Sequence, residues 1–271
     1  MPRKAREASK TGIYHVMLRG VNRQDIFECE KDFLKFLYLM QRAVFPEDEN
    51  GKPMPPKLII YAYCLMPNHV HLLVKEQDIK ISDAIKSISV SYAFYFNVKY
   101  EHLGHLFQDR FRSETVNDLD YFVTLIRYIH QNPVVAGLVN QVIDYRWSSW
   151  CEYDPKKKVI IPVCCTNTVL EKMSYGALEE IVNTPIPKTK RILDFDNDTT
   201  VRMTDDRVRN YIRYACEVDL MSEIQQMPHE QRDDILRRVL RYGASIRQVS
   251  RVTGVSRGII QRIRNKLDEQ S

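Results

Sequence analysis

Hydrophobic positions in the first half of the chain alternate between two spacings. Short stretches rich in branched and aromatic side chains predict strands over residues 12–19, 58–65, 69–75 and 113–116. Apolar side chains three and four positions apart predict amphipathic helices over residues 31–45, 81–100 and 119–131. The order strand, helix, strand, strand, helix, strand predicts a ferredoxin-like α+β fold, an antiparallel sheet with helices on one face, followed by an extra helix.

Turn and cap residues refine these boundaries. A tight turn at Met66, Pro67 and Asn68 makes the second and third strands antiparallel neighbours. Ser82 is the expected N-cap of the second helix, and Asn117 or Asp118 that of the third. We expect Pro133 to end the third helix, since a proline disfavours helical geometry at the residue before it.

Past Trp150 the pattern changes to charged, proline-bearing segments around one short helical piece near residues 168–182. We therefore predict three parts: a domain over residues 1–152, a linker with short helices over 153–203, and an all-α domain over 204–271. The last part has helical spacing over residues 205–216, 229–242, 245–253 and 256–266.

The final two helices predict a helix-turn-helix. Ser245 and Ser256 are N-cap candidates and Gly254 lies at the turn. A shared core is expected from Val249, Val255, Ile260 and Ile263.

Charge is uneven along the chain. The net charge is only +5, yet residues 235–267 contain no acidic residue and nine basic ones: Arg237, Arg238, Arg241, Arg247, Arg251, Arg257, Arg262, Arg264 and Lys266. Such a concentration suits contact with DNA phosphates, although a helical bundle with a solvated basic face would have the same composition.

The remaining composition is that of an ordinary globular protein. The six cysteines form no CxxC pair, and no apolar run is long enough to span a bilayer. We therefore expect a cytoplasmic protein with reduced thiols and no membrane partner.

Two short motifs are candidates for chemistry. His69 and His71 are two apart on a predicted strand and so share one face, where two imidazoles could hold one metal ion or one phosphate. Tyr128 and Asn132 are four apart on the third helix and also share a face. Structural histidines, a core tyrosine and a helix-capping asparagine would fit the same spacings, and Tyr121 lies on a similar face.

Taken together, these motifs resemble the single-tyrosine HUH transposases, and within them the REP-associated branch. The stretches that carry the resemblance lie between residues 12 and 150: YHVMLRGVNR, YCLMPNHVH, GHLFQDRFRS and RYIHQNPVVAGL. The C-terminal helices resemble, more weakly, the DNA-binding domain at the C-terminus of DnaA initiators.

The resemblance implies a metal-dependent endonuclease and strand-transferase acting on single-stranded or hairpin DNA. His69, His71 and, by position, Asn132 would hold Mg²⁺ or Mn²⁺, and Tyr128 would form a 5′-phosphotyrosine link. Insertion-sequence relatives usually have glutamine where this chain has Asn132. Relatives act as monomers or as homodimers.

DNA contacts are expected from arginines in both parts of the chain. Beside the motifs these are Arg19, Arg23, Arg110 and Arg112, and in the helix-turn-helix, which would add affinity for duplex DNA, they are Arg247, Arg251, Arg257 and Arg262. Phe107 and Phe111 could stack on bases. The alternative function is a domesticated, catalytically silent regulator that binds structured or repeat DNA.

Overall fold

The structure is a computed structural model that describes residues 7–157, 159, 161–185, 205–216, 218 and 220–268. Contacts between Cα atoms divide the chain into two compact units. The first takes the described residues of Met1–Asn132 and Gln141–Asn197, and the second those of Pro133–Asn140 and Asp198–Ser271.

The first unit is built on a four-stranded sheet of order β2-β3-β1-β4. The strands are β1 (Ile13–Arg19), β2 (Leu58–Met66), β3 (His69–Glu76) and β4 (Arg112–Val116), and every neighbouring pair is antiparallel. The outer connections, β1 to β2 and β3 to β4, each skip one strand position through a helix. This is the ferredoxin-like α+β arrangement, so the predicted fold class is confirmed.

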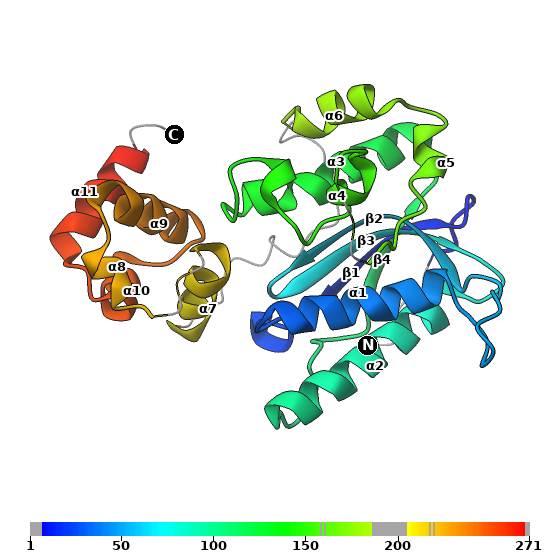
Figure 1. Ribbon diagram of the computed structural model, residues 1–271, viewed down its shortest axis with the longest axis horizontal. Coiled ribbons are helices and arrows are strands. Elements are labelled where there is room, and N and C mark those ends of the chain that lie inside the picture. The colour runs from blue at the N-terminus through cyan, green and yellow to red at the C-terminus, as the bar shows by residue number, and fades with distance from the viewer. Residues whose placement is uncertain are drawn as a thin grey trace. The chain divides into compact units, whose positions relative to one another are not determined.

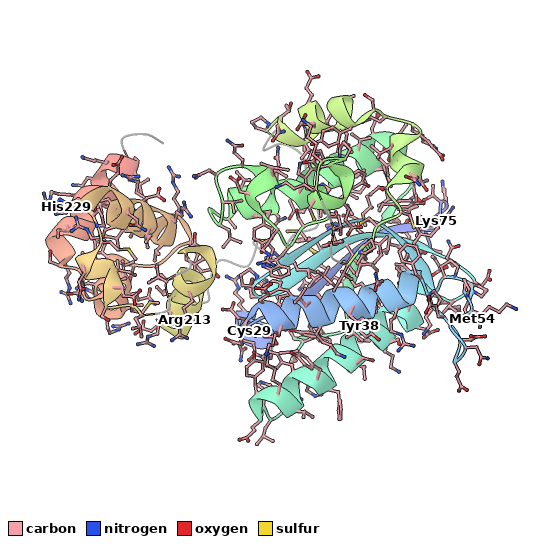
Figure 2. All side chains as sticks on the ribbon, in the orientation of Figure 1. Cys29, Tyr38, Met54, Lys75, Arg213 and His229 are labelled. Atoms are coloured by element: carbon pink, nitrogen blue, oxygen red, sulfur yellow. The ribbon has the colours of Figure 1, made fainter. Side chains whose placement is uncertain are left out.

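Two helices, α1 (Glu30–Val44) and α2 (Ile81–Tyr100), lie together on one side of this sheet (Figure 1). The side chains between them and the sheet are buried and include a cluster of aromatic rings, with the Phe27 and Phe33 rings stacked at 4.2 Å. In Figure 2, Cys29 marks the start of α1 and Lys75 lies near the end of β3. This layer covers one face of the sheet, and most residues of β1, β2 and β3 are buried, as strands covered on both faces require.

The opposite side of the sheet carries α3 (Leu119–Val135), with α4 (Trp150–Tyr153), α5 (Asn167–Leu170) and α6 (Tyr175–Asn183) beyond it (Figure 1). A short 3₁₀ turn, Val142–Asp144, precedes a segment that runs along β2: Leu65 donates its N–H to Trp147 and Ser149 donates to Tyr63. The segment therefore covers the outer edge of the sheet.

Several predicted boundaries need correction. Pro133 does not end α3, which continues to Val135 with the proline inside it. Ser82 is not the N-cap of α2, because the helix begins at Ile81, whose N–H is bound by the Glu76 side chain at 2.7 Å. The β2–β3 turn has two residues rather than three, since Met66 belongs to β2. Of the two cap candidates for α3, Asp118 accepts the Tyr121 N–H at 2.7 Å.

The regular elements that the structure describes in the second unit are helices. The unit contains α7 (Asp205–Cys216), α8 (Glu223–Gln226), α9 (His229–Arg241), α10 (Ile246–Thr253) and α11 (Arg257–Asp268). Ser245 caps α10 in a capping box with Gln248, and Gly254 ends it in the left-handed conformation at φ 71°. Val249, Val255, Ile260 and Ile263 are buried, as the predicted shared core requires.

The predicted linker begins inside the first unit. Val163, Val169, Leu178 and Val182 are buried there, and residues 186–203 of the predicted linker lie outside the described residues. The predicted limits of the functional domains stay predictions. No helix within the described ranges is long and apolar enough to cross a membrane.

Candidate functional site

One face of the sheet gathers the polar residues of three strands. His71 lies opposite Met17 of β1 and His69 opposite Arg19. His15 lies opposite Leu73 on one side and Glu114 of β4 on the other. Directly opposed residues share a face of the sheet, so His15, His69, His71, Arg19 and Glu114 line the same surface. This is the face toward α3, away from α1 and α2.

The three histidines are in contact. The His69 and His71 ring centroids are 4.9 Å apart at an interplanar angle of 85°, and the His15 ring stacks on His71 at 5.3 Å. His15 Nε2 lies 3.1 Å from His71 Nδ1, and Asn68 Oδ1 lies 2.8 Å from His69 Nδ1. His69 and His71, which we call the HUH-motif histidines, thus each have their Nδ1 held by a neighbouring side chain.

Burial sets the protonation of His71. The side chain has no exposed surface, and its buried Nε2 has no hydrogen-bond partner among the described residues. Desolvation, with smaller contributions from His69 and His15, holds the pKa of His71 well below its ordinary value. A neutral imidazole is the form that binds metal ions.

Tyr128 comes to this cluster from α3. Its ring meets His71 edge-on at 5.4 Å and His15 at 5.9 Å. Of the residues that the sequence singled out, the structure thus brings Tyr128, His69 and His71 together.

The helix that carries Tyr128 is fixed to the sheet two residues further on. His130 is fully buried, and its Nδ1 lies 2.8 Å from the Ile126 carbonyl, which can only accept, so Nδ1 carries the hydrogen. Its Nε2 is then free to accept from the Ser149 hydroxyl at 2.7 Å, and Ser149 Oγ in turn accepts the Tyr63 N–H of β2 at 2.9 Å. Burial lowers the pKa of His130 to about 4, so the chain of hydrogen bonds is neutral.

Tyr121, the other tyrosine on a similar face of α3, is engaged elsewhere. Its hydroxyl donates to Glu114 Oε2 at 2.5 Å. Burial first, and then this carboxylate, raise the pKa of Tyr121. The hydroxyl is therefore a poor source of a phenolate.

Asn132 is half-buried in the last turns of α3, and its neighbour Gln131 points away from the site. The Gln131 amide donates to the carbonyls of Val182 at 2.7 Å and Thr184 at 2.6 Å. Among the described residues no group of three or more His, Cys, Asp or Glu side chains could hold a metal ion.

The predicted DNA-binding arginines of the first unit differ in exposure. Arg19 is buried beside His69, Arg23 is half-buried with φ 62°, and Arg110 and Arg112 are exposed. Arg112 of β4 lies opposite Met17 of β1, and Met17 in turn lies opposite His71 of β3. Phe107 is partly exposed, whereas Phe111 is buried and belongs to the core.

In the second unit Arg247, Arg251, Arg257 and Arg262 are all exposed. Arg251 is paired with Asp205 of α7 through two hydrogen bonds, one of them between Nη2 and Oδ1 at 2.6 Å. Hydrogen bonding to Arg251 lowers the pKa of Asp205. Arg237 and Arg238 share Asp234, so part of the basic charge is neutralised within the unit.

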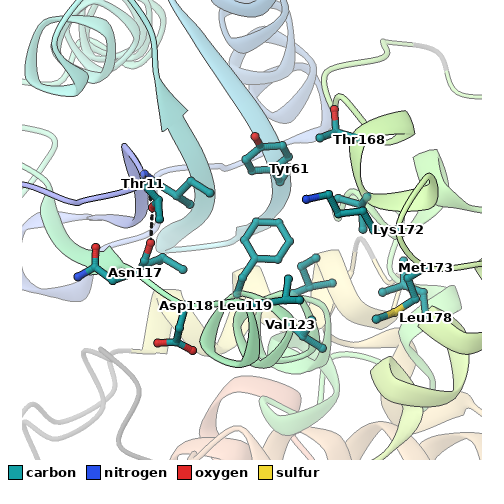
Figure 3. A pocket seen from close by; sticks show the side chains of 15 residues that line it. Thr11, Tyr61, Asn117, Asp118, Leu119, Val123, Thr168, Lys172, Met173 and Leu178 are labelled. Atoms are coloured by element: carbon teal, nitrogen blue, oxygen red, sulfur yellow. Dashed lines mark hydrogen bonds between the residues drawn. The ribbon is translucent and has the colours of Figure 1, made fainter.

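A pocket of about 240 Å³ beside α3 is a separate feature (Figure 3). Thr11 and Asn117 lie on one side of it and Lys172 and Leu178 on the other. Its lining is mainly apolar and includes neither the three histidines nor Tyr128.

Sequence patterns alone missed His15, Asn68, His130 and Ser149. A signal for His15 existed, because the ferredoxin-like strand order makes β1 the neighbour of β3 and the YHV stretch then brings a third histidine next to the pair. Asn68 directly precedes the motif in the turn. The bond between His130 and Ser149 joins residues without a common spacing, so no pattern predicts it.

Comparison with known proteins agrees with this arrangement. Residues 8–132 match the family described as Transposase IS200 like. The matched part contains the sheet, all three histidines and Tyr128, and the match confirms the resemblance to the tyrosine transposases.

Similarity to other proteins is limited. A solved structure, "Structure of the REP associates tyrosine transposase bound to a REP hairpin", is similar over 72% of this chain and 100% of that chain, with 18% sequence identity and a TM-score of 0.46. A search of curated proteins gave no match.

Proposed function

We propose that this chain is a metal-dependent single-stranded DNA endonuclease and strand-transferase that uses Tyr128 as its nucleophile. The observation that carries the proposal is the contact of the Tyr128 ring with His71, at 5.4 Å, beside a second HUH-motif histidine. A tyrosine that only fills the core needs no histidines beside its ring. A tyrosine nucleophile needs the two histidines if they hold a cation.

The residues present fit a divalent ion. His69 and His71 would supply imidazole nitrogens and Asn132 an amide oxygen, a mixed donor set that suits Mg²⁺ or Mn²⁺ with open positions for DNA oxygens. The buried Nε2 of His71, which has no hydrogen-bond partner, is the group that such an ion would satisfy. When bound, the ion would polarise the scissile phosphate.

Tyr128 would attack phosphorus through its hydroxyl oxygen. A phosphate–oxygen bond then forms on the tyrosine, and the bond to the departing 3′-oxygen breaks, which leaves a 5′-phosphotyrosine and a 3′-hydroxyl. The phosphodiester energy is kept in the new bond, so a second strand end can reverse or complete the transfer. His130 and Ser149 hold α3 against β2 during this step.

Single-stranded or hairpin DNA is the proposed substrate. Arg23, Arg110 and Arg112 are at least partly exposed in the first unit and would neutralise phosphates near the site. The exposed arginines of the second unit would add affinity for duplex DNA.

The test is a trapping experiment. Labelled single-stranded DNA from beside the gene that encodes this chain is incubated with the protein and Mn²⁺ or Mg²⁺. Wild type should form a covalent adduct and Tyr128→Phe should form none, because only the attacking oxygen is removed. Tyr121→Phe is the matched control on the same helix and should retain the adduct. If no variant, wild type included, cleaves DNA from either side of the gene but all of them bind it, the silent regulator is the better account.

A further inference from the structure

We infer that His15 and Asn68 are positioning residues that hold His71 and His69 in the tautomer with hydrogen on Nδ1 and an electron pair on Nε2. The inference rests on the proposed function, because it assigns the metal-binding atom of each histidine. It starts from two contacts of Nδ1: 3.1 Å to His15 Nε2 and 2.8 Å to Asn68 Oδ1.

The Asn68 contact fixes the direction of its hydrogen bond. The Asn68 amide nitrogen faces the Arg23 carbonyl at 3.4 Å, and a carbonyl can only accept, so the amide is oriented with its oxygen toward His69. Since that oxygen accepts, His69 Nδ1 must donate. A neutral His69 then carries its electron pair on Nε2.

Asn68 is itself held in place. The residue is almost completely buried, and its backbone carbonyl accepts the Gly20 N–H at 3.0 Å. The backbone carbonyl of the preceding Pro67 accepts the N–H groups of Ile26 and Phe27. The two-residue turn is therefore tied to the chain that follows β1. A side chain anchored in this way can orient an imidazole ring.

The direction of the His15 contact follows from the other nitrogen of His71. If His15 donated, the hydrogen of His71 would lie on its buried Nε2, where the proposed function places a cation. If His71 Nδ1 donates, the hydrogen of His15 lies instead on its own buried Nδ1, so burial alone does not decide between the two directions. We assign donation to His71 because only this direction leaves an electron pair on His71 Nε2 for the cation of the proposed function.

Neighbours of this kind matter in metal sites because they fix both the tautomer and the ring orientation of a ligand. Their loss typically weakens metal affinity about 10- to 100-fold. The two positioning residues are asymmetric: a turn amide serves His69, and a stacked histidine of another strand serves His71. The HUH-motif pair thus depends on residues from β1 and from the turn.

The first experiment measures the tautomers directly. In metal-free protein labelled with ¹⁵N at histidine, long-range ¹H–¹⁵N spectra distinguish hydrogen on Nδ1 from hydrogen on Nε2. We expect the Nδ1–H form for His69 and His71 in wild type. Hydrogen on Nε2 of either histidine would overturn the inference for that residue, whatever the metal does.

The second experiment measures Mn²⁺ affinity from the signal of free Mn²⁺ in electron paramagnetic resonance. His15→Leu and Asn68→Leu should each weaken binding about 10- to 100-fold. His15→Gln and Asn68→Asp keep an acceptor oxygen and should bind Mn²⁺ close to wild type. Thermal melting of the metal-free variants shows whether each one folds. If a Leu variant does not fold, the Gln and Asp variants and the wild-type spectra still decide the test.

Asn97→Leu is the matched control. Asn97 Oδ1 contacts Nδ1 of His102 at 3.1 Å, the same kind of bond away from the three histidines, so its loss should leave Mn²⁺ affinity unchanged. If wild type and the His69→Ala, His71→Ala double variant bind Mn²⁺ equally, the metal site of the proposed function fails. If that double variant loses binding while both Leu variants keep it, only the roles of His15 and Asn68 fail.

Discussion

The histidine cluster of the first unit and helices α10 and α11 of the second hold their polar groups in opposite ways. His71 and His15 have no exposed surface, and His71 Nδ1 lies 3.1 Å from His15 Nε2 across two paired strands. Arg247, Arg257 and Arg262 stand exposed on helices whose apolar residues form the core beneath them.

In the proposed function, this difference separates two kinds of DNA contact. Buried groups with defined neighbours can position one atom for a reaction, but a single substitution disturbs several bonds at once. Exposed arginines act mainly as charges, so each contributes a similar, salt-dependent share of affinity. Changes in the first region should therefore alter the rate of cleavage, and changes in the second should alter binding.

The largest effect is expected from removing both HUH-motif histidines. His69→Ala combined with His71→Ala should abolish DNA cleavage and Mn²⁺ binding, because the proposed metal site then loses both of its imidazole ligands. Cleavage is followed with saturating labelled DNA, and circular dichroism checks the fold. Normal cleavage by the double variant would contradict the metal assignment.

A smaller effect is expected in stability as the pH falls. The pKa of buried His130 is about 4 when folded, against an ordinary 6.5, so the unfolded chain takes up a proton that the folded chain resists. The contribution of His130 to the free energy of unfolding is complete above pH 6.5 and is lost as the pH falls toward 4. At 1.36 kcal/mol per pKa unit, this loss is about 3 kcal/mol.

Urea unfolding at about pH 7 and about pH 4 measures this loss. Buried His71 contributes in the same direction, so the comparison is with His130→Gln, which should lose less stability over the same interval. Replacing the exposed His105 with glutamine is the control and should leave the interval as in wild type. Equal losses in wild type and His130→Gln would show that His130 is not buried as a neutral group.

The smallest effect is expected from the exposed arginines. Replacing Arg247, Arg257 and Arg262 with glutamine in the full chain should reduce the slope of log affinity against log salt by about 0.9 for each duplex phosphate that the variant no longer neutralises. Cleavage at saturating single-stranded DNA should not change. Arg251→Gln serves as a comparison, since Arg251 already pairs with Asp205 and should change the slope less. Identical slopes for the triple variant and wild type would remove the proposed DNA-binding role from these helices.

Much of the fold could be predicted because its elements are locally encoded. The bounds of α2 and α7 were predicted to the residue, and those of β1, β3 and α11 to within two. Pro133 was wrongly expected to end α3, since a general preference against proline in helices does not decide a single case. The two-residue turn was predicted with one residue too many because Met66 can pair at the end of β2.

Less of the site could be predicted. His69, His71 and Tyr128 stand in short motifs, but His15 approaches them only through the pairing of β1 with β3. The link from His130 through Ser149 to Tyr63 joins three distant segments. Such contacts depend on tertiary packing, which periodicity along the chain does not record.

The central claim, that Tyr128 is the nucleophile, is tested most directly by locating the covalent bond. Protein incubated with single-stranded DNA and Mn²⁺ is digested with nuclease and protease, and its peptides are sequenced by mass spectrometry. We predict that, of the chain's 15 tyrosines, Tyr128 alone carries a nucleotide linked through a 5′-phosphate. A nucleotide on Tyr121 or on any other residue, or one linked through a 3′-phosphate, would contradict the assignment.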